Sequence, residues 1–326
     1  MKKKIALVTG GFSGEAAISY KSATTIYNHL DKELFDVYKI DINPTGWFYE
    51  EGDKVIEVNK NDFSLFLDDK KVTFDAVFIG MHGTPGEDGK LQGYFDMLCL
   101  PYTSCNAATS ALTFNKRYTV AVAEMAGIHV AKSVHLFKHT TYDADTILSQ
   151  LKMPLFVKPN NGGSSIGMSK VHKNEDLQPA LEKAFKEDTQ VLVEEMITGR
   201  EFTVGVFKSG GAIQVLPITE VSTNKDFFDF EAKYSGLATE VTPAQIEDTW
   251  KEKVEKAAVK IYEVFNCNGM VRIDFIYNAE KNAPFMLEIN TVPGQSEASI
   301  IPQQVKAKGW KLEEFYTKLL QDALNG

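Results

Sequence analysis

The chain has 326 residues, of which 44% are hydrophobic and 24% are charged, and its formal net charge is −9. This length suits two or three globular domains, and no stretch approaches the ~18 uninterrupted apolar residues of a membrane span. The acidic balance argues against a nucleic-acid-binding surface, and three scattered cysteines without a C-x-x-C pair suggest neither a disulfide framework nor a zinc site. We therefore expect a protein of the reducing cytoplasm that binds neither membrane nor nucleic acid.

The first hundred residues have the pattern of an open α/β unit. Apolar strands are predicted at 5–9, 35–42 and 76–80, and a helix at 16–30 follows the turn Gly-Gly-Phe-Ser-Gly-Glu. The N–H groups of such a turn can bind an anion. Its glycine spacing does not fit a dinucleotide fingerprint, although Asp41 at the end of the next strand keeps that alternative open. Glu15 at the helix start either complements the helix dipole or receives a substrate ammonium group.

From about residue 105 the pattern is α+β. Helices are predicted at 107–126, 175–187 and 249–265, and strands at 155–158, 191–196, 201–207, 213–219 and 270–277. Residues 220–243 have no clear period and are too long for a simple connection, which is typical of a lid or binding loop.

Two short motifs near the C terminus combine acidic and amide side chains. In Arg272-Ile-Asp274 and Glu288-Ile-Asn290 the polar residues alternate with apolar ones, so on strands each pair shares one face. If 278–284 is a hairpin turn, two carboxylates and an amide oxygen converge, which suits Mg²⁺ better than zinc. The alternative is a solvent-facing polar edge with cross-strand charge pairing.

A glycine-rich loop, VKPNNGGSSIGMSKV, is a candidate phosphate-binding loop. Gly162 and Gly167 have Walker A spacing, but Met168 follows where that motif requires lysine, and the lysine lies upstream at Lys158. Glycine N–H groups and serine hydroxyls can approach phosphate oxygens, whereas the plain alternative is a turn rich in small residues. His82, in the loop MHGTPGEDG, is either a polar turn residue or an anion contact.

Taken together, these segments resemble the ATP-grasp superfamily and, within it, the D-alanine–D-alanine ligase family. The resemblance is colinear and covers nearly the whole chain. Nine blocks carry it: GGFSGEAAIS, MHGTPGEDGKLQG, LPYTS, FNK, PLFVKPNNGGSSIGMSKV, VLVEE with GREFTV, FFDFEAKY, RIDF and LEINTVPGQSEASIIPQQ. It implies a three-domain fold: an N-terminal substrate-binding α/β domain at 1–104, a central small α+β lobe at 105–193, and a C-terminal α+β lobe at 194–326 with the magnesium site and the lid loop 220–243.

The resemblance also implies roles for individual residues. For the first D-alanine, Glu15 would bind the ammonium group, and Ser164 and Tyr234 would link to Glu15. His82 would lie near the carboxylate of this substrate. For ATP they are Lys116, Lys158, Gly163 and Ser165 at the phosphates, Glu194, Glu195 and Ile197 at the adenine, Glu201 at the ribose, and Lys233 at phosphoryl charge. Asp274, Glu288 and Asn290 would bind two Mg²⁺ ions, for which Mn²⁺ can substitute. Arg272 and the Gly294 N–H would face the oxyanion, and Ser299 with the Ile300 N–H would hold the second substrate's carboxylate.

The activity implied by the resemblance is ATP-dependent formation of D-alanyl-D-alanine through an acyl phosphate, for peptidoglycan precursors, by a cytoplasmic homodimer. Three features depart from the family pattern. Glu195 stands where many members have lysine, Ser296-Glu297-Ala298 replaces a run of small polar residues or histidine, and Phe230 replaces a tyrosine. The second of these puts acceptor recognition in doubt, so a sister ligase that uses D-lactate or another amino acid stays an alternative. A nicotinamide-dependent oxidoreductase and a catalytically silent nucleotide-binding module are the more distant ones.

Overall fold

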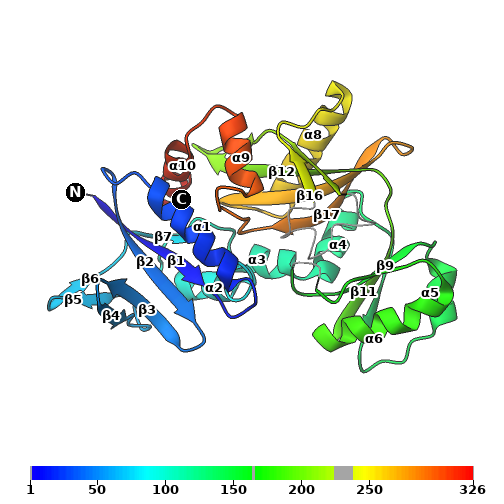
Figure 1. Cartoon of the computed structure of the whole chain (residues 1–326), viewed down its shortest axis with the longest axis horizontal. Coiled ribbons are helices and arrows are strands. Elements are labelled where there is room, and N and C mark those ends of the chain that lie inside the picture. Colours follow the sequence, from blue (N-terminus) through cyan, green and yellow to red (C-terminus); the bar gives the residue numbers. More distant parts are fainter. Residues whose placement is uncertain (1, 164–165, 224–237, 326) are drawn as a thin grey trace.

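Three β-sheets organise the chain in sequence order (Figure 1). The structure is a computed structural model that describes residues 2–163, 166–223 and 238–325. In this part of the chain, no helix is long and apolar enough to cross a membrane.

The first sheet has the order β4-β3-β2-β1-β7. Its parallel strands β2 (Phe35–Asn43), β1 (Lys3–Gly10) and β7 (Ala76–Ile79) confirm the predicted α/β unit, and β3 (Gly46–Glu51) and β4 (Lys54–Glu57) add an antiparallel edge that the sequence analysis missed. A two-stranded sheet, β5 (Leu65–Leu67) with β6 (Lys70–Val72), flanks it.

Side chains of β1 are buried on both faces of this sheet. Ile5 and Leu7 pack with α1 (Ala16–His29) and α10 (Leu312–Asn325), whereas Ala6 and Val8 face the cluster that contains Phe95 of α2 (Lys90–Met97). Helices on both faces are typical of parallel sheets. The C-terminal helix therefore covers the N-terminal sheet.

The second sheet is antiparallel, with the order β10-β9-β11-β8. Its strands are β8 (Ser133–Phe137), β9 (Leu155–Pro159), β10 (Ser169–Val171) and β11 (Gln190–Glu195). The face with Val157 and Val193 packs under α5 (Ala144–Gln150) and α6 (Leu177–Glu187), and η1 (Asn174–Asp176) precedes α6. Because side chains alternate along a strand, Lys158 and Glu194 lie on the opposite face of this sheet.

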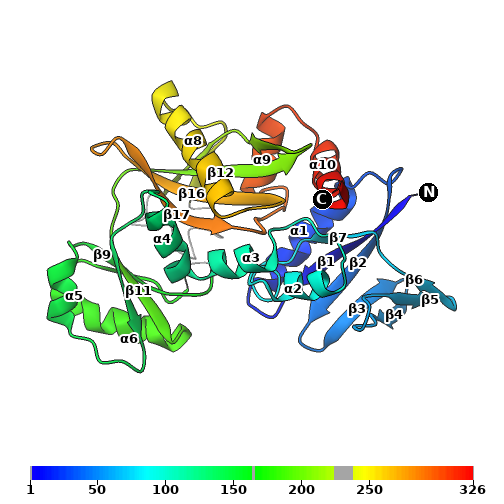
Figure 2. The same ribbon diagram turned by 180° about the vertical axis from the view of Figure 1, so that it is seen from behind.

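The third sheet has the order β15-β14-β12-β16-β17, with β13 beside β12. Its strands are β12 (Arg200–Ser209), β13 (Ala212–Val215), β14 (Thr219–Thr223), β15 (Ala238–Val241), β16 (Met270–Asn278) and β17 (Ala283–Asn290), and α8 (Asp248–Val264) and α9 (Ile300–Ala307) accompany it. Helices α3 (Ala107–Phe114) and α4 (Lys116–Met125) run beneath this sheet toward the central lobe (Figure 2). Ala123 of α4 belongs to the same core cluster as Phe202 and Ile273, so part of the predicted central segment builds the C-terminal core.

Three predicted elements differ from the structure. The helix expected at 107–126 is two helices, because Asn115 is extended (φ −97°, ψ 104°) and its side chain caps α4 by accepting from the Tyr118 N–H. The strand expected at 213–219 ends at Val215, and β14 starts at Thr219. The ends of the segment 220–243 are paired strands, β14 with β15, and the phenylalanines of the expected lid, Phe227, Phe228 and Phe230, lie outside the described residues.

Candidate active site

The predicted hairpin between residues 270 and 290 is confirmed. In the register of β16 and β17, Asp274 lies opposite Glu288 and Arg272 lies opposite Asn290, with an irregularity between Asp274 and Phe275. Directly opposite residues of an antiparallel pair project on the same face. The two carboxylates, the amide and the guanidinium therefore share one patch of the third sheet.

Four donors surround the buried carboxylate of Asp274. Its Oδ1 accepts from Arg272 Nε at 2.9 Å and from Thr203 Oγ1 at 2.5 Å, and its Oδ2 accepts from Arg272 Nη2 at 2.8 Å and from Asn290 Nδ2 at 3.3 Å. A carboxylate offers about four lone-pair positions, so these four contacts occupy its capacity. Burial alone would lower the pKa of Arg272, but the charge and hydrogen bonds of Asp274, with Glu288 and Glu87, raise it well above its usual range.

The donor set fits Mg²⁺. Asn290 turns its Nδ2 toward Asp274, and rotation of this amide would release a lone pair of Asp274 and direct the amide oxygen to a metal ion shared with this carboxylate. Glu288 is more accessible, with a side chain 36% exposed and Oε1 3.9 Å from Arg272 Nη2. No group of three or more carboxylate, histidine or cysteine side chains suited to a metal occurs among the described residues. Two carboxylates and an amide match a magnesium site that completes its shell with phosphate oxygens and water.

The two predicted phosphate lysines belong to different elements. Lys158 on β9 forms an ion pair with Glu194 on β11, with Nζ 2.5 Å from Oε1, and both side chains are nearly buried. Lys116, the first residue of α4, donates from Nζ to the Gly162 carbonyl at 2.8 Å, inside the glycine loop. The Glu195 carboxylate accepts from the Lys152 N–H at 3.0 Å, so it is bonded to the connection between α5 and β9.

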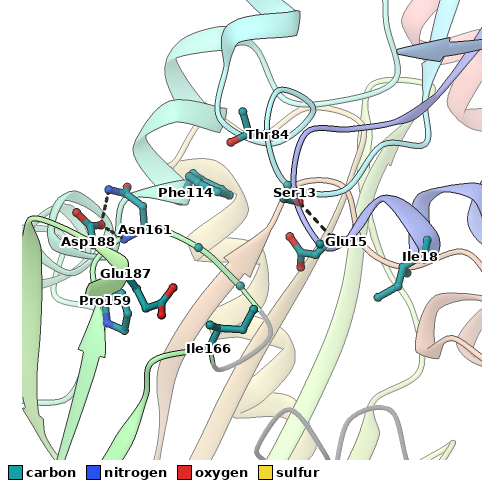
Figure 3. A pocket seen from close by; sticks show the side chains of 15 residues that line it. Ser13, Glu15, Ile18, Thr84, Phe114, Pro159, Asn161, Ile166, Glu187 and Asp188 are labelled. Atoms are coloured by element: carbon teal, nitrogen blue, oxygen red, sulfur yellow. Dashed lines mark hydrogen bonds between the residues drawn. The ribbon is translucent and has the colours of Figure 1, made fainter. Parts of the chain in front are cut away.

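A cavity of about 560 Å³ lies between the N-terminal lobe, which contains the first sheet, and the central lobe, which contains the second sheet (Figure 3). Ser13, Glu15 and Ile18 line one side, and the other side is formed by Pro159, Asn161, Glu187 and Asp188. Gly162 and Gly163 also line the cavity. The metal-site carboxylates Asp274 and Glu288 are not among the described residues that line it.

The Glu15 carboxylate lies between two glycines from different lobes. A Cβ on Gly83 would lie 2.7 Å from Glu15 Oε2, and a Cβ on Gly163 would lie 2.8 Å from Glu15 Oε1. A side chain at either glycine would have to displace the Glu15 carboxylate from this position. The predicted ammonium-binding residue is therefore held against the predicted phosphate loop.

His82 is buried, and both of its ring nitrogens bond to protein atoms. Nδ1 is 2.7 Å from the Val292 carbonyl and Nε2 is 2.9 Å from Ser22 Oγ. Burial lowers the pKa of His82 to about 4, and the charge of Arg272 lowers it further against the effect of the Val292 carbonyl. His82 is therefore neutral at pH 7 and joins α1 to the loop after β17; its predicted contact with a substrate carboxylate stays a prediction.

Glu87 is a residue that the sequence analysis missed, although it lies within the motif MHGTPGEDG. Its carboxylate accepts from the Gly83 N–H at 2.7 Å and from the Val292 N–H at 3.2 Å. Burial raises its pKa to about 8, and the charge of Glu15 acts in the same direction. A carboxyl that joins two substrate-side loops could not be told from a turn residue by spacing alone.

The predicted residues for the second substrate cluster at the start of α9. Ser299 is the N-cap of α9, its Oγ is 2.7 Å from Ser296 Oγ, and a Cβ on Gly294 would lie 2.9 Å from Ser299 Oγ. Ile300 is the first residue of the helix, where N–H groups have no partner within the helix. This end of α9 can therefore bind a carboxylate.

The remaining predicted site residues have simpler outcomes. Glu201 lies on β12 opposite Ile276, and Ile197 lies in the connection between β11 and β12. Ser164, Ser165, Lys233 and Tyr234 lie outside the described residues. Asp41, which carried the dinucleotide alternative, accepts from Tyr20 Oη at 2.9 Å and from Asn43 Nδ2 at 2.8 Å, so its carboxylate is engaged by side chains of α1 and β2.

Comparisons with known proteins agree along the whole chain. Residues 4–105 match the family model described as "D-ala D-ala ligase N-terminus", and residues 120–321 match "D-ala D-ala ligase C-terminus". A D-alanine–D-alanine ligase of Flavobacterium johnsoniae is 43% identical over 323 residues, 99% of each chain. Among solved structures, the VanG D-Ala:D-Ser ligase of Enterococcus faecalis has a TM-score of 0.87 and 30% identity, covering 98% of this chain and 99% of that one. A D-alanine–D-alanine ligase of Bacillus anthracis complexed with ATP has a TM-score of 0.80 and 25% identity, covering 99% and 98%. The chain belongs to the D-alanine–D-alanine ligase family.

Proposed function

We propose that the protein joins two D-alanine molecules to D-alanyl-D-alanine at the expense of ATP. The observation that carries this proposal is the approach of the Glu15 carboxylate to Gly163 at the cavity between the lobes. An amino acid whose ammonium group binds Glu15 would present its carboxylate to the phosphate loop. Membership of the ligase family supports the same reading.

In the first step, a carboxylate oxygen of the first D-alanine attacks the γ-phosphorus of ATP, and the bond to the ADP oxygen breaks. Lys158 and Lys116 would hold the phosphates through charge-assisted hydrogen bonds. Mg²⁺ held by Asp274, Glu288 and Asn290 would supply further charge neutralisation. The products of this step are ADP and an acyl phosphate.

In the second step, the amine of the second D-alanine attacks the acyl carbon, loses its proton, and expels inorganic phosphate. Negative charge develops on the carbonyl oxygen, where Arg272 and the Gly294 N–H would donate. Because Asp274 already fixes the Arg272 guanidinium through two hydrogen bonds, this donor needs no reorganisation when the charge appears. The α9 N-terminus, with Ser299, would hold the carboxylate of the attacking amino acid.

We also propose that the enzyme acts as a cytoplasmic homodimer, as the family resemblance implies. Sedimentation analysis with and without ATP tests the dimer. A single species at the mass of one chain, 36.3 kDa, would contradict it.

The activity is tested by following ADP release with D-alanine, D-serine, D-lactate and L-alanine, and by identifying products by mass spectrometry. We expect ADP release that depends on D-alanine and a dipeptide formed in equal amount. Release without a dipeptide, or preference for another acceptor, would contradict the stated specificity. Nucleotide binding without any ADP would favour a silent binding module instead.

A further inference from the structure

Asn160, which is 1% exposed and directly follows β9, ties this strand to the start of α4. Its backbone carbonyl accepts from the Lys116 N–H at 3.2 Å, and its Oδ1 accepts from the Arg117 N–H at 2.8 Å. The first N–H groups of a helix have no partner within the helix. Asn160 therefore caps α4 from a different lobe, in addition to the helix's own cap, Asn115.

This cap connects the two predicted phosphate lysines. Lys158 lies on β9, two residues before Asn160, and Lys116 begins the capped helix. Lys116 Nζ also donates to the carbonyl of Gly162, two residues after Asn160. Asn160 therefore connects the segments that carry both lysines, and Lys116 closes the connection by its hydrogen bond to the start of the glycine loop.

The same cap joins two lobes. Strand β9 belongs to the central sheet, whereas α4 packs through Ala123 into the core of the third sheet. A shift at Asn160 would change the position of Lys158 relative to Lys116, and also relative to the carboxylates of the third sheet.

We propose that Asn160 is a positioning residue that sets the separation of Lys116 and Lys158 for the phosphates of ATP. The inference deepens the proposed function and rests on it for the role of the two lysines. Asn160 acts through them and needs no contact with the nucleotide.

The amide itself supports this inference. Aspartate caps a helix as well as asparagine does and favours the helix dipole. Asn160 Nδ2, however, is buried and has no hydrogen-bond partner among the described residues, so an aspartate would bury an unpaired charged oxygen at this position. The neutral amide therefore supplies the cap to the Arg117 N–H without a buried charge between the segments that carry the two lysines.

The experiment measures the affinity of the full chain for MgATP by calorimetry, without D-alanine, together with thermal midpoints. We expect Asn160→Ala to weaken ATP binding by about 10- to 100-fold, the scale of a displaced contact. Asn160→Asp keeps the acceptor for the Arg117 N–H, so its ATP affinity should stay within about threefold of wild type, although the buried charge should lower the thermal midpoint. Wild-type affinity in Asn160→Ala would overturn the proposal. A loss of about 10- to 100-fold in Asn160→Asp would also overturn it, because the cap is retained, and this outcome decides the case if Asn160→Ala does not fold.

A double-mutant cycle separates positioning from general structure. In a Lys116→Ala background, Asn160→Ala should cost less than about twofold, because the residue through which it acts is gone. Equal costs in both backgrounds would show that Asn160 does not act through Lys116.

Asn106 provides the matched control, because its side chain caps α3 by accepting from the Thr109 N–H at 2.9 Å. Asn106→Ala should lower the thermal midpoint while ATP affinity stays at the wild-type value. An equal loss of affinity in this control would reduce Asn160 to a general stability residue. If wild-type protein binds ATP but forms no dipeptide, the proposed function fails while the role of Asn160 in ATP binding is still decided.

Discussion

Arg272 bridges the two carboxylates of the third sheet: its Nη2 lies 2.8 Å from Asp274 Oδ2 and 3.9 Å from Glu288 Oε1. The guanidinium therefore neutralises part of the charge that would otherwise repel across the strand pair. A metal ion arriving at Glu288 would share this carboxylate with Arg272. The two carboxylates therefore have one cation supplied by the protein, the Arg272 guanidinium, and can bind a metal ion as a second.

Replacing Glu288 with glutamine should remove a metal ligand with little effect on folding, because its side chain is 36% exposed. We expect kcat to fall by about 100- to 1000-fold and the magnesium concentration for half-maximal activity to rise. Steady-state ADP release across a magnesium titration measures both. Glu280→Gln, at an exposed position in the turn of the same hairpin, is the control and should behave as wild type. An unchanged magnesium requirement in Glu288→Gln would contradict the metal assignment.

The Lys158–Glu194 pair separates stability from ATP binding. Lys158→Gln leaves the Glu194 carboxylate without its cation, and breaking such a nearly buried pair costs about 3–5 kcal/mol. The double variant Lys158→Gln with Glu194→Gln should regain most of this stability, since no lone charge remains. ATP affinity should stay reduced by about tenfold or more in both, because the phosphate contact is lost.

Urea unfolding and calorimetry with ATP measure these two effects of the Lys158 variants. Lys3→Gln, which breaks an exposed ion pair with Asp75, is the control and should change the free energy of unfolding and the ATP affinity much less. Recovery of ATP binding in the double variant would show that Lys158 serves only to neutralise Glu194.

His82 makes stability depend on pH. Since burial lowers its pKa to about 4, the unfolded chain takes up a proton between the ordinary value of 6.5 and about 4 while the native protein does not. The contribution of His82 to the free energy of unfolding therefore falls as the pH drops, and at pH 5 it is about 2 kcal/mol lower than at pH 7.5. Urea unfolding at pH 7.5 and pH 5.0 should show this difference for wild type relative to His82→Gln.

Glu87 has the opposite sign, because burial raises its pKa to about 8 and the native protein binds its proton more tightly than the unfolded chain. Its contribution to stability grows as the pH falls from about 8 toward 4.5. The comparison of wild type with His82→Gln cancels this contribution. Parallel pH profiles for the two proteins would contradict the neutral, buried His82.

A methyl group on Gly163 tests the approach of Glu15 to the glycine loop. Its Cβ would lie 2.8 Å from Glu15 Oε1, and no backbone strain arises because Gly163 lacks a positive φ. The flexible carboxylate should move away, so Gly163→Ala should raise the KM for D-alanine at the first subsite by about tenfold. Initial rates at saturating ATP measure this. Gly93→Ala, whose Cβ would make only an ordinary contact 3.7 Å from Ala107, is the control. An unchanged KM would show that Glu15 does not bind the substrate.

Several parts of the fold could be predicted because the local pattern is strong. The alternation around Arg272 and Asp274 predicts both the strand and the shared face, and the register of β16 with β17 agrees. The break at Asn115 could not be predicted in the same way, because an asparagine inside an apolar helical pattern reads equally well as an exposed helix residue. The buried role of Asn160 depends on a hydrogen bond with a helix residue 43 positions earlier, which spacing does not reveal.

The sequence by itself determined several of the strands and helices, the identity of the charged residues, and the resemblance to a ligase family, since these depend on residue type and near-neighbour spacing. Only the tertiary structure decided which of these residues meet. It placed Glu15 against Gly163, committed both nitrogens of His82 to protein partners, and surrounded Asp274 with four donors. Burial and hydrogen-bond geometry arise from segments far apart in the chain, so they are properties of the packed molecule and not of any local sequence pattern.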